Sequence, residues 1–517
     1  MLMKANVRVG PVLAALLTLS QTAAADEPRK VTEPMVMREP GNIVNVVDAF
    51  DGPDDFDMNI SLGYERIWKT SKLVRETHMS ELEGSSGGYT AANTNVGTYT
   101  QDVSKLNTRV DIGLYHDVGL VFRMPIVLSD DRKIEAVDGS DTRQALILEG
   151  AVGEQLFQLP FESPTRSGIE YLAVGLDFGI MNQWRDPTKP TWVFGIEGRF
   201  NVSEPMHACG KSGFVTGEDC AFPSDLNRNG IQDAPDGSAV DSGNNPIQLE
   251  GTNIGSSRAA GISRGTTLLE GHSFLSKRIQ YLEPYAGMRA FFEFQNKNSD
   301  FGKTDLQGAL VNHPPFGGTM VAGMYIIPWE VYDRFQRIAF DVRLKGTYRS
   351  QGRDYTELFD ALGSSSSPSL RRPNYAQYQG FNPADGASGT DAAIESVVNT
   401  NSQKVYFTGI TDVQQHGIYA VNGSFLWQAG EYIKFDLGGG LTWVQGHLIT
   451  YDQPCNPDFA GGTDVAGPCR TSSASGDAVA TGIPNPNYRP GINVPGRRFK
   501  VESSTELNAW VNATVMF

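Results

Sequence analysis

The feature that most constrains this chain is a segment of about ten residues in which apolar and polar side chains alternate, repeated along most of its length. The clearest copy, residues 170–180, separates two kinds of side chain: Leu172, Val174, Leu176, Phe178 and Ile180 against Gly175, Asp177 and Gly179. Successive side chains of a strand point to opposite faces, so each copy predicts a strand with one apolar and one polar face.

The expected strands lie at 58–64, 106–116, 120–128, 170–180, 191–202, 266–278, 282–294, 319–329, 337–348, 417–427, 433–443 and in the C-terminal segment. Short turns follow the even-numbered strands, and long polar connections follow the odd-numbered ones, the longest at about 203–264, 350–415 and 450–498. A soluble β-sandwich also has alternating strands, but it does not explain long loops that all fall on one side. We therefore predict an all-β fold, a transmembrane antiparallel up-and-down β-barrel of about 12 strands with short periplasmic turns and long extracellular loops.

The first 25 residues have the three parts of an export signal. Lys4 and Arg8 form a basic start, residues 12–20 form a short apolar core, and three alanines ending at Ala25 form a cleavage site. The apolar core is too short for a membrane anchor. Residues 1–25 are therefore expected to be a signal peptide that exports the chain.

The exported chain is expected to have two parts. Residues 26–55 are interpreted as a periplasmic N-terminal segment, a partly ordered tail in preference to a piece tucked into the lumen, and residues 56–517 as the barrel. No apolar run in the exported chain is long enough for a membrane-spanning helix. The formal net charge of -16 argues against a nucleic-acid partner, which a basic patch would attract.

The four cysteines fall into two local pairs within polar connections. Cys209 with Cys220 and Cys455 with Cys469 is the simplest of the three possible connectivities. Disulfides form in the oxidising space to which an export signal leads, where each bridge would staple one long loop. A metal site is the weaker interpretation, because the spacings are not CxxC and no histidine stands at the spacing of a metal-ligand motif.

One loop carries the spacing of a calcium site. In the stretch DLNRNGIQDAPDG, side-chain oxygens recur at Asp225, Asn227, Asn229, Asp233 and Asp236. Gly230 permits a sharp turn, and the carbonyl of Ile231 would add another oxygen; calcium takes six to eight oxygen ligands. The motif resembles the calcium loops of thrombospondin type 3 repeats, although two Asn stand where Asp is frequent. The resemblance implies a structural calcium ion, and the alternative is a polar turn.

Many charges fall on the polar strand faces, which would line the barrel lumen: Arg109, Asp111, Arg123, Asp177, Glu197, Arg199, Glu283, Arg289, Glu293, Asp341, Arg343, Lys345, Lys434 and Asp436. Charges in a closed interior must pair or meet water. Two interpretations stay open, a hydrated solute path or a lumen sealed by ion pairs. No catalytic residues are predicted, because the sequence shows no evident nucleophile with a base and an orienting partner, so an enzyme is not expected.

The last strand alternates up to Phe517, with Val515 and Val511 on the same apolar face. This resembles the C-terminal assembly signal of bacterial outer-membrane barrel proteins, in which the chain ends on an aromatic residue. The resemblance implies recognition by the barrel assembly machinery and residence among the lipids of a Gram-negative outer membrane. We predict a channel for passive passage of small solutes; the alternative is a non-conducting adhesin, receptor or structural barrel that presents calcium- and disulfide-stabilised loops.

Overall fold

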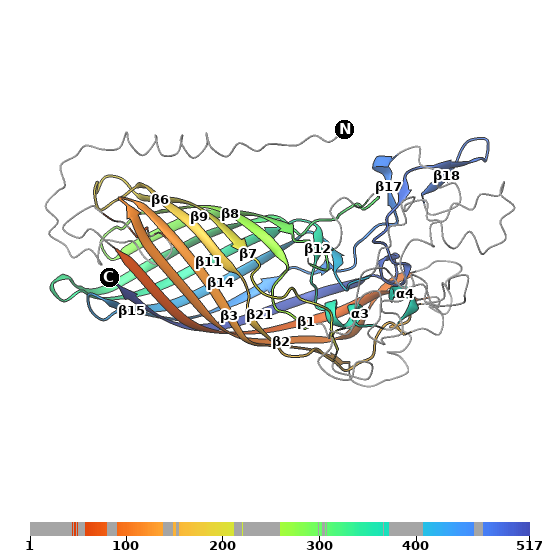
Figure 1. Ribbon diagram of the computed structural model, residues 1–517, viewed down its shortest axis with the longest axis horizontal. Helices are drawn as coiled ribbons and strands as arrows, with labels where there is room; N and C mark the ends of the chain where they lie inside the picture. The colour runs from red at the N-terminus through yellow and green to blue at the C-terminus, as the bar shows by residue number, and fades with distance from the viewer. Residues whose placement is uncertain are drawn as a thin grey trace, which may run out of the picture.

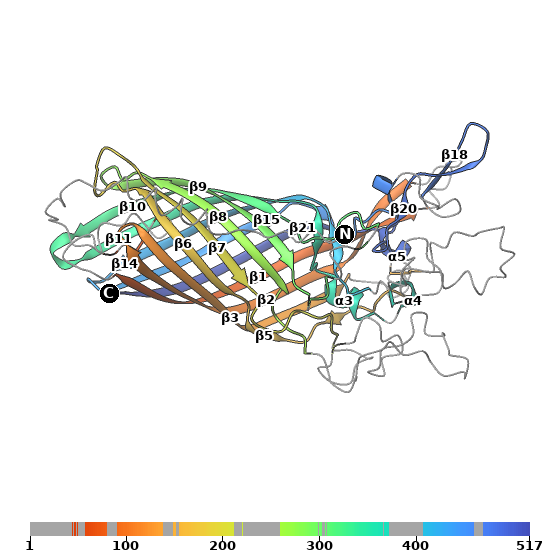
Figure 2. The ribbon, with the colours of Figure 1, turned by 45° about the horizontal axis from the view of Figure 1, so that its top comes forward.

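The computed structural model describes residues 44, 46–47, 49, 57–79, 90–137, 148–150, 155–210, 220, 259–297, 299–301, 306, 308–365, 367–371, 407–459 and 469–517. Within these residues, twelve antiparallel strands form one closed sheet (Figures 1 and 2). In order around the barrel they are β1 (Met58–Met79), β2 (Thr90–Tyr115), β3 (Val118–Ala136), β6 (Leu172–Met181), β7 (Thr191–Phe200), β8 (Thr266–Ser276), β9 (Leu282–Gln295), β10 (Gly317–Val331), β11 (Gln336–Arg349), β14 (His416–Gln428), β15 (Ile433–Val444) and β21 (Phe499–Met516). The predicted fold class is confirmed.

The barrel closes where its first and last strands meet. β1 pairs with β21 over most of its length, beginning with Asn59 opposite Met516. Phe517 continues this seam, because its N–H donates to the Met58 carbonyl at 2.9 Å and its carbonyl accepts from the Met58 N–H at 3.2 Å. A closed seam satisfies the backbone groups that an open edge would leave bare in lipid.

The first three strands are much longer than alternation predicts. β1 was expected to end at residue 64, yet it continues to Met79 and stays paired with β2 throughout. The additional stretch includes Lys69, Thr70 and Lys72, which do not separate into an apolar and a polar face. Where a strand leaves the lipid, both faces meet water or protein, so backbone pairing continues without the alternation that lipid imposes.

The outer surface of the barrel carries an apolar belt. On β11, Phe340, Val342 and Leu344 are 46%, 49% and 55% exposed, which places them outside rather than in the lumen. Exposed tryptophans lie near strand ends: Trp192, Trp329, Trp427 and Trp443. An apolar band bordered by aromatic side chains matches the hydrocarbon core of a bilayer and its two interfaces. In the described part of the chain, no helix has the length and apolarity needed to span a membrane.

The end of the barrel that carries the long loops is covered by a structured cap, at the right of Figures 1 and 2. Its elements are β4 (Phe161–Glu162), β5 (Arg166–Ile169), β12 (Gly352–Asp354), α3 (Phe359–Gly363), α4 (Pro368–Arg371), β13 (Thr411–Val413), β16 (His447–Leu448), β17 (Cys455–Asn456), β18 (Arg470–Ser472), β19 (Ala478–Ala480), β20 (Ile483–Pro484) and α5 (Pro490–Asn493). An apolar core joins β4, α3, α4, α5 and adjacent loop residues to the outer ends of β1, β2, β3 and β21: Leu73, Val96, Tyr99, Ile134, Leu148, Leu156, Phe157, Phe161, Leu358, Ala361, Leu362, Leu370, Phe407, Ile449, Ile492, Phe499 and Val501.

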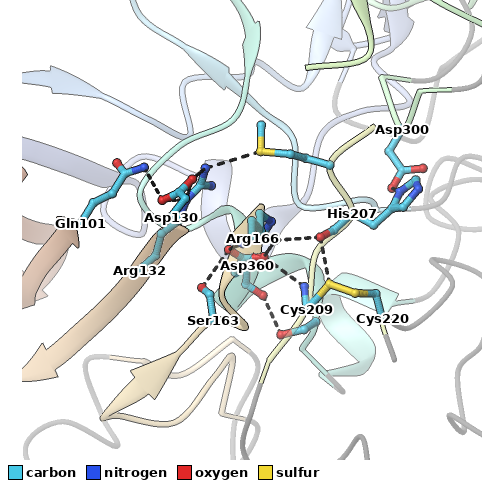
Figure 3. A network of polar contacts seen from close by, with 12 residues as sticks. Gln101, Asp130, Arg132, Ser163, Arg166, His207, Cys209, Cys220, Asp300 and Asp360 are labelled. Atoms are coloured by element: carbon cyan, nitrogen blue, oxygen red, sulfur yellow. Dashed lines mark hydrogen bonds and ion pairs between the residues drawn. A yellow bond between two sulfur atoms is a disulfide. The ribbon is translucent and has the colours of Figure 1, made fainter. Parts of the chain in front are cut away.

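A buried ion pair joins three segments of this cap (Figure 3). The guanidinium of Arg166 donates to both carboxylate oxygens of Asp360, at 2.6 and 3.0 Å. The Ser163 hydroxyl and the Cys209 N–H also donate to this carboxylate, at 2.8 and 3.0 Å. Cys209 is in turn bonded to Cys220, so the disulfide holds its loop against the ion pair. Because the donors come from two separate segments, residues 163–166 and Cys209, the carboxylate of Asp360 joins them to its own segment.

Residues near the N-terminus occupy the opposite mouth of the barrel, where the turns are short. Ala49 exchanges two backbone hydrogen bonds, of 3.2 and 2.6 Å, with His116 in the turn between β2 and β3. Val44 is buried against inward-facing side chains of the wall: Val193, Phe274, Tyr285, Val321, Tyr325, Ile327 and Ala339. Most of residues 26–55 lie outside the described residues, so the interpretation of this segment stays a prediction. The predicted signal peptide lies outside the described residues.

Candidate functional site: a charged cavity inside the barrel

A cavity of about 410 Å³ lies inside the barrel between the cap and the N-terminal residues. Most of the side chains that line it are polar or charged: Glu65, Asn107, Arg109, Val121, Arg123, Gly175, Asp177, Val193, Glu197, His272, Phe274, Arg289, Arg343, Lys345, Asn422, Asp436, Asn508, Trp510 and Asn512. They come from every part of the wall, because each strand turns its polar face inward. The cavity is therefore a widening of the lumen and not a cleft between domains.

On one side of the cavity, arginines and glutamates of adjacent strands form a continuous chain. Glu197 on β7 is paired with Arg123 and accepts from Nε of Arg199 at 2.8 Å. The other end of Arg199 contacts Glu270 on β8 at 2.8 Å, and Glu270 also contacts Arg289 at 3.4 Å. Each strand presents its charged residue at the same level, so opposite charges alternate around the wall.

A glycine makes room for a second polar pair in this wall. Nε2 of His272 on β8 lies 2.9 Å from a carboxylate oxygen of Asp177 on β6. The strand between them carries Gly195, and a Cβ added there would lie 2.1 Å from Asp177 and 2.3 Å from His272. The absence of a side chain on β7 thus allows β6 and β8 to interact across it.

The facing wall holds its carboxylates mainly with amides. Glu65 accepts from Asn107 at 2.9 Å and from Asn508 at 3.2 Å, and lies 3.4 Å from Lys105. Asp436 accepts from the indole N–H of Trp510 at 3.1 Å and from Asn512 at 3.3 Å. These amides are long enough to bridge neighbouring strands and carry no charge, so they orient the carboxylates without neutralising them.

The predicted lumen residues divide into three groups in the structure. Eight line the cavity: Arg109, Arg123, Asp177, Glu197, Arg289, Arg343, Lys345 and Asp436. Three others pair with these: Asp111 with Arg109, Asp341 with Arg343, and Arg199 with Glu197. The last three are Glu283, which accepts from Ser276 near the short turns, Glu293, which pairs with Arg264 near the cap, and Lys434 on β15, none of which lines the cavity.

Sequence reasoning missed the uncharged lining residues, although alternation contained the signal for them. Asn508 and Asn512 share an inward face of β21 with Trp510, while Val511 between them is 47% exposed on the outside. Trp510 is apolar enough to be taken for a lipid-facing residue. Its position in the alternation, and not its hydropathy, identifies it as a lumen residue.

The structure joins Cys209 to Cys220 and Cys455 to Cys469, the local pairing that the sequence favours. The predicted calcium ligands Asp225, Asn227, Asn229, Ile231, Asp233 and Asp236 lie outside the described residues. Among the residues that are described, no three His, Cys, Asp or Glu side chains are grouped to hold a metal. The calcium loop therefore stays a prediction.

A closed antiparallel barrel with an apolar outer belt and a charged interior defines a transmembrane β-barrel protein of the outer-membrane type. Three solved structures are similar to it, each at 8% sequence identity. They are an outer-membrane channel from Pseudomonas putida F1 (TM-score 0.34, covering 93% of this chain and 99% of that one), a FadL homologue from Pseudomonas aeruginosa (0.30, 95% and 99%) and the toluene transporter TodX from P. putida (0.28, 93% and 99%).

No protein-family model matches the chain, and no curated protein matches it in sequence. At the scores given above, the structural likenesses assign neither a substrate nor a function. What the protein does has to be argued from its own lumen.

Proposed function

We propose that this protein is an outer-membrane channel through which small polar solutes pass passively. The observation that carries the proposal is the cavity of about 410 Å³ lined mainly by charged and amide side chains. Burying such groups away from water is costly unless each is fully paired, so a lumen lined in this way favours water over a dry interior. Water in the lumen provides the path that a polar solute needs.

A hydrophobic cargo fits this lumen less well. One structural neighbour is a toluene transporter, but the cavity here presents the Arg123–Glu197 pair and Arg289 to whatever enters. An aromatic hydrocarbon in contact with these groups would remove water from them without offering hydrogen bonds in return. We therefore favour polar solutes.

The N-terminal residues provide a gate at the periplasmic mouth in this proposal. Val44 is held by apolar contacts, and Ala49 by two backbone hydrogen bonds to His116. This attachment is small compared with the pairing of the barrel strands, so it can release without opening the wall. Passage through this mouth then requires displacement of one short segment.

The second candidate function is a non-conducting surface barrel that presents its loops. The packing of the cap favours it, because 17 buried apolar residues close the extracellular end. Under this alternative the lumenal charges serve only to hold the wall together, and the cap is the functional surface. The two candidates differ in whether ions cross the membrane.

Planar-bilayer recording of the purified full chain separates the candidates. We expect discrete conductance steps, and a larger open fraction for Val44→Asp, because a charge does not tolerate the apolar contacts that hold the segment in place. The matched control is Val479→Asp, a change at an exposed cap residue that should leave the recording unaltered. If neither the wild type nor Val44→Asp gives conductance steps, although insertion into the bilayer has been verified, the protein is not a channel.

Two features outside the lumen complete the proposal. We propose that the barrel assembly machinery recognises Phe517, Val515 and Val511, so that deleting Phe517 reduces the amount of folded protein in the outer membrane. We also propose that the loop at residues 225–237 binds calcium as a structural ion. Neither role is required for conduction, and each has its own test.

A further inference from the structure

Lys345 is a cation of the lumen that has no partner among the described residues. Lys345, on the inward face of β11, lines the cavity, and its ammonium makes no hydrogen bond or ion pair with any residue that the structure describes. Its electrostatic surroundings are mixed, because Arg343 and Arg289 repel it while Glu65 and Asp341 attract it more weakly. A lysine that faces a cavity with its charge uncompensated is available to a ligand.

Arg289, on β9, is only partly compensated. Among the described residues, Arg289 donates one hydrogen bond, of 3.4 Å, to a carboxylate oxygen of Glu270. The other oxygen of Glu270 accepts from Arg199 at 2.8 Å. Its guanidinium carbon lies 5.2 Å from the centre of the Phe274 ring, so the side chain is supported from one side. Arg123 and Arg199 add further positive potential around it.

The register of the sheet brings these two cations to the same level of the lumen. Val321 on β10 pairs with Lys345 on one side and with Gly287 on the other, and Thr319 pairs with Arg289. Lys345 and Arg289 therefore flank a single intervening strand, displaced by two residues along it. Arg343 follows on β11 toward the periplasmic end, so a line of cations runs along this part of the wall.

Each carboxylate that lines the cavity accepts at least one hydrogen bond from the wall, although Oδ1 of Asp436 has no partner among the described residues. Glu65 and Asp436 accept from amides and an indole, Asp177 from His272, and Glu197 from two arginines. Glu506 on β21 has no such donor among the described residues, but it does not line the cavity, and Lys69 and Lys105 are the cations that attract it most. Of the five Arg and Lys side chains that line the cavity, Arg109, Arg123 and Arg343 pair closely with carboxylates, which leaves Lys345 and Arg289 available to a ligand.

We propose that Lys345 and Arg289 form a binding site for small anions inside the lumen, and that the channel passes anions, including small carboxylates, in preference to cations. The inference rests on the proposed channel function and names its substrate class. The guanidinium offers two parallel donors that match a carboxylate, and the ammonium adds a mobile point charge beside it. Positive potential along this part of the lumen wall would raise the local concentration of anions and disfavour cations.

The test is the reversal potential of the full chain in a planar bilayer that separates two concentrations of potassium chloride. The reversal potential of the wild type should have the sign that indicates a higher permeability for chloride than for potassium. A gradient of potassium acetate should give a reversal potential of the same sign. Lys345→Gln with Arg289→Gln should reduce the chloride-to-potassium permeability ratio several-fold. Lys133→Gln removes one positive charge from an exposed pair with Glu135, outside the cavity, and should leave the ratio unchanged.

The outcomes separate the inference from the function on which it rests. Conductance steps with potassium as the more permeant ion, or a ratio that the double substitution does not change, would overturn the anion site and keep the channel. Silence from every variant would overturn the channel and the site with it. Lys345→Arg keeps a positive charge at this position and should keep the wild-type chloride-to-potassium permeability ratio. This variant distinguishes loss of an anion site from a general disturbance of the wall.

Discussion

The cap and the lumen are built from the same kinds of charged residue and use them in opposite ways. In the cap, Arg166 and Asp360 are 0% and 5% exposed, and all donors to the carboxylate come from protein. In the lumen, the side chain of Arg289 is 35% exposed and reaches Glu270 only at 3.4 Å. The Arg166–Asp360 pair is shielded from water and joins loops of the cap, whereas the Arg289–Glu270 pair belongs to the hydrated wall of the lumen.

The difference follows from what surrounds each pair. The apolar core of the cap excludes water, so a charge there must be neutralised by protein groups with close geometry. The lumen has too few apolar side chains to exclude water, and its charges can be left partly unpaired at little cost. Dry charges therefore hold structure, whereas wet charges remain free to act on a solute.

The largest expected effect comes from breaking the dry pair. Arg166→Met leaves the Asp360 carboxylate buried without its cation, which costs about 3–5 kcal/mol. Cleavage of the cap by trypsin should accelerate on the order of 100-fold or more, because it follows the population of the open cap. The matched lumenal change, Arg289→Met, should cost less than about 1 kcal/mol. Equal effects at the two sites would remove the distinction between cap and lumen.

The disulfide beside this pair should have the next largest effect. Replacing Cys209 and Cys220 by Ser frees a loop whose ends are 11 residues apart and should cost about 2–4 kcal/mol in cap stability. The N–H of Cys209 donates to Asp360, so this loss should be non-additive with Arg166→Met. The Cys455 and Cys469 pair of the outer loop is the control and should add independently. Additive costs at both bridges would argue against one cooperative network.

A buried carboxylate of the cap gives a smaller effect that depends on pH. Burial raises the pKa of Asp452 to about 6, against the opposing influence of Arg353 and the hydrogen bond from Asn485. The folded cap then holds a proton that the unfolded chain releases near pH 4, so cap stability falls as pH rises from about 4 to about 6. Asp452→Asn should stabilise the cap at pH 7 by roughly 1–3 kcal/mol and have little effect at pH 4.

Thermal midpoints of wild type and Asp452→Asn, recorded from pH 4 to pH 8, check this prediction. Burial and the charge of Asp452 also raise the pKa of Asp412 well above its ordinary range, so the two carboxyls should titrate together. A wild-type midpoint that rises between pH 4 and pH 6, relative to the variant, would contradict the sign derived above.

The smallest expected effect on the barrel comes from calcium. Asp225→Ala with Asp233→Ala should abolish calcium binding in titration calorimetry and increase proteolysis within the loop at residues 225–237. Conductance should be unchanged, because the proposed ion stabilises a loop and not the lumen. The control replaces Asp458, an acidic residue of the cap outside this loop, by Ala. Retention of calcium binding by the double variant would remove the site.

The sequence predicts the strands of the structure only where contact with lipid imposes an alternation of apolar and polar side chains. Alternation located all twelve barrel strands, because Phe340 and its neighbours face lipid while Arg343 faces the lumen. The cap has no such pattern. Leu358, Leu362 and Phe499 form one core only after distant loops meet, and no local period announces that contact.

The sequence predicts which side chains face the lumen, but it does not predict which of them interact with one another. The side of the strand on which Lys345 lies follows from alternation, but its lack of a partner depends on the register of β9, β10 and β11. A shift of register would give the same inward residues different neighbours. The contacts of Val44 could not be predicted from the sequence, because its apolar patch is short and its partners lie on strands far along the chain.

The most direct test of the central claim, that solutes pass through this cavity, is to place a thiol in it. All four native cysteines are in disulfides, so Asn508→Cys would supply a single free thiol on the cavity wall. Labelling it with a charged methanethiosulfonate should reduce the single-channel current, while the same label at Ser475→Cys, on the exposed cap, should not. Complete labelling at residue 508, verified by mass spectrometry, with an unchanged current would contradict the claim.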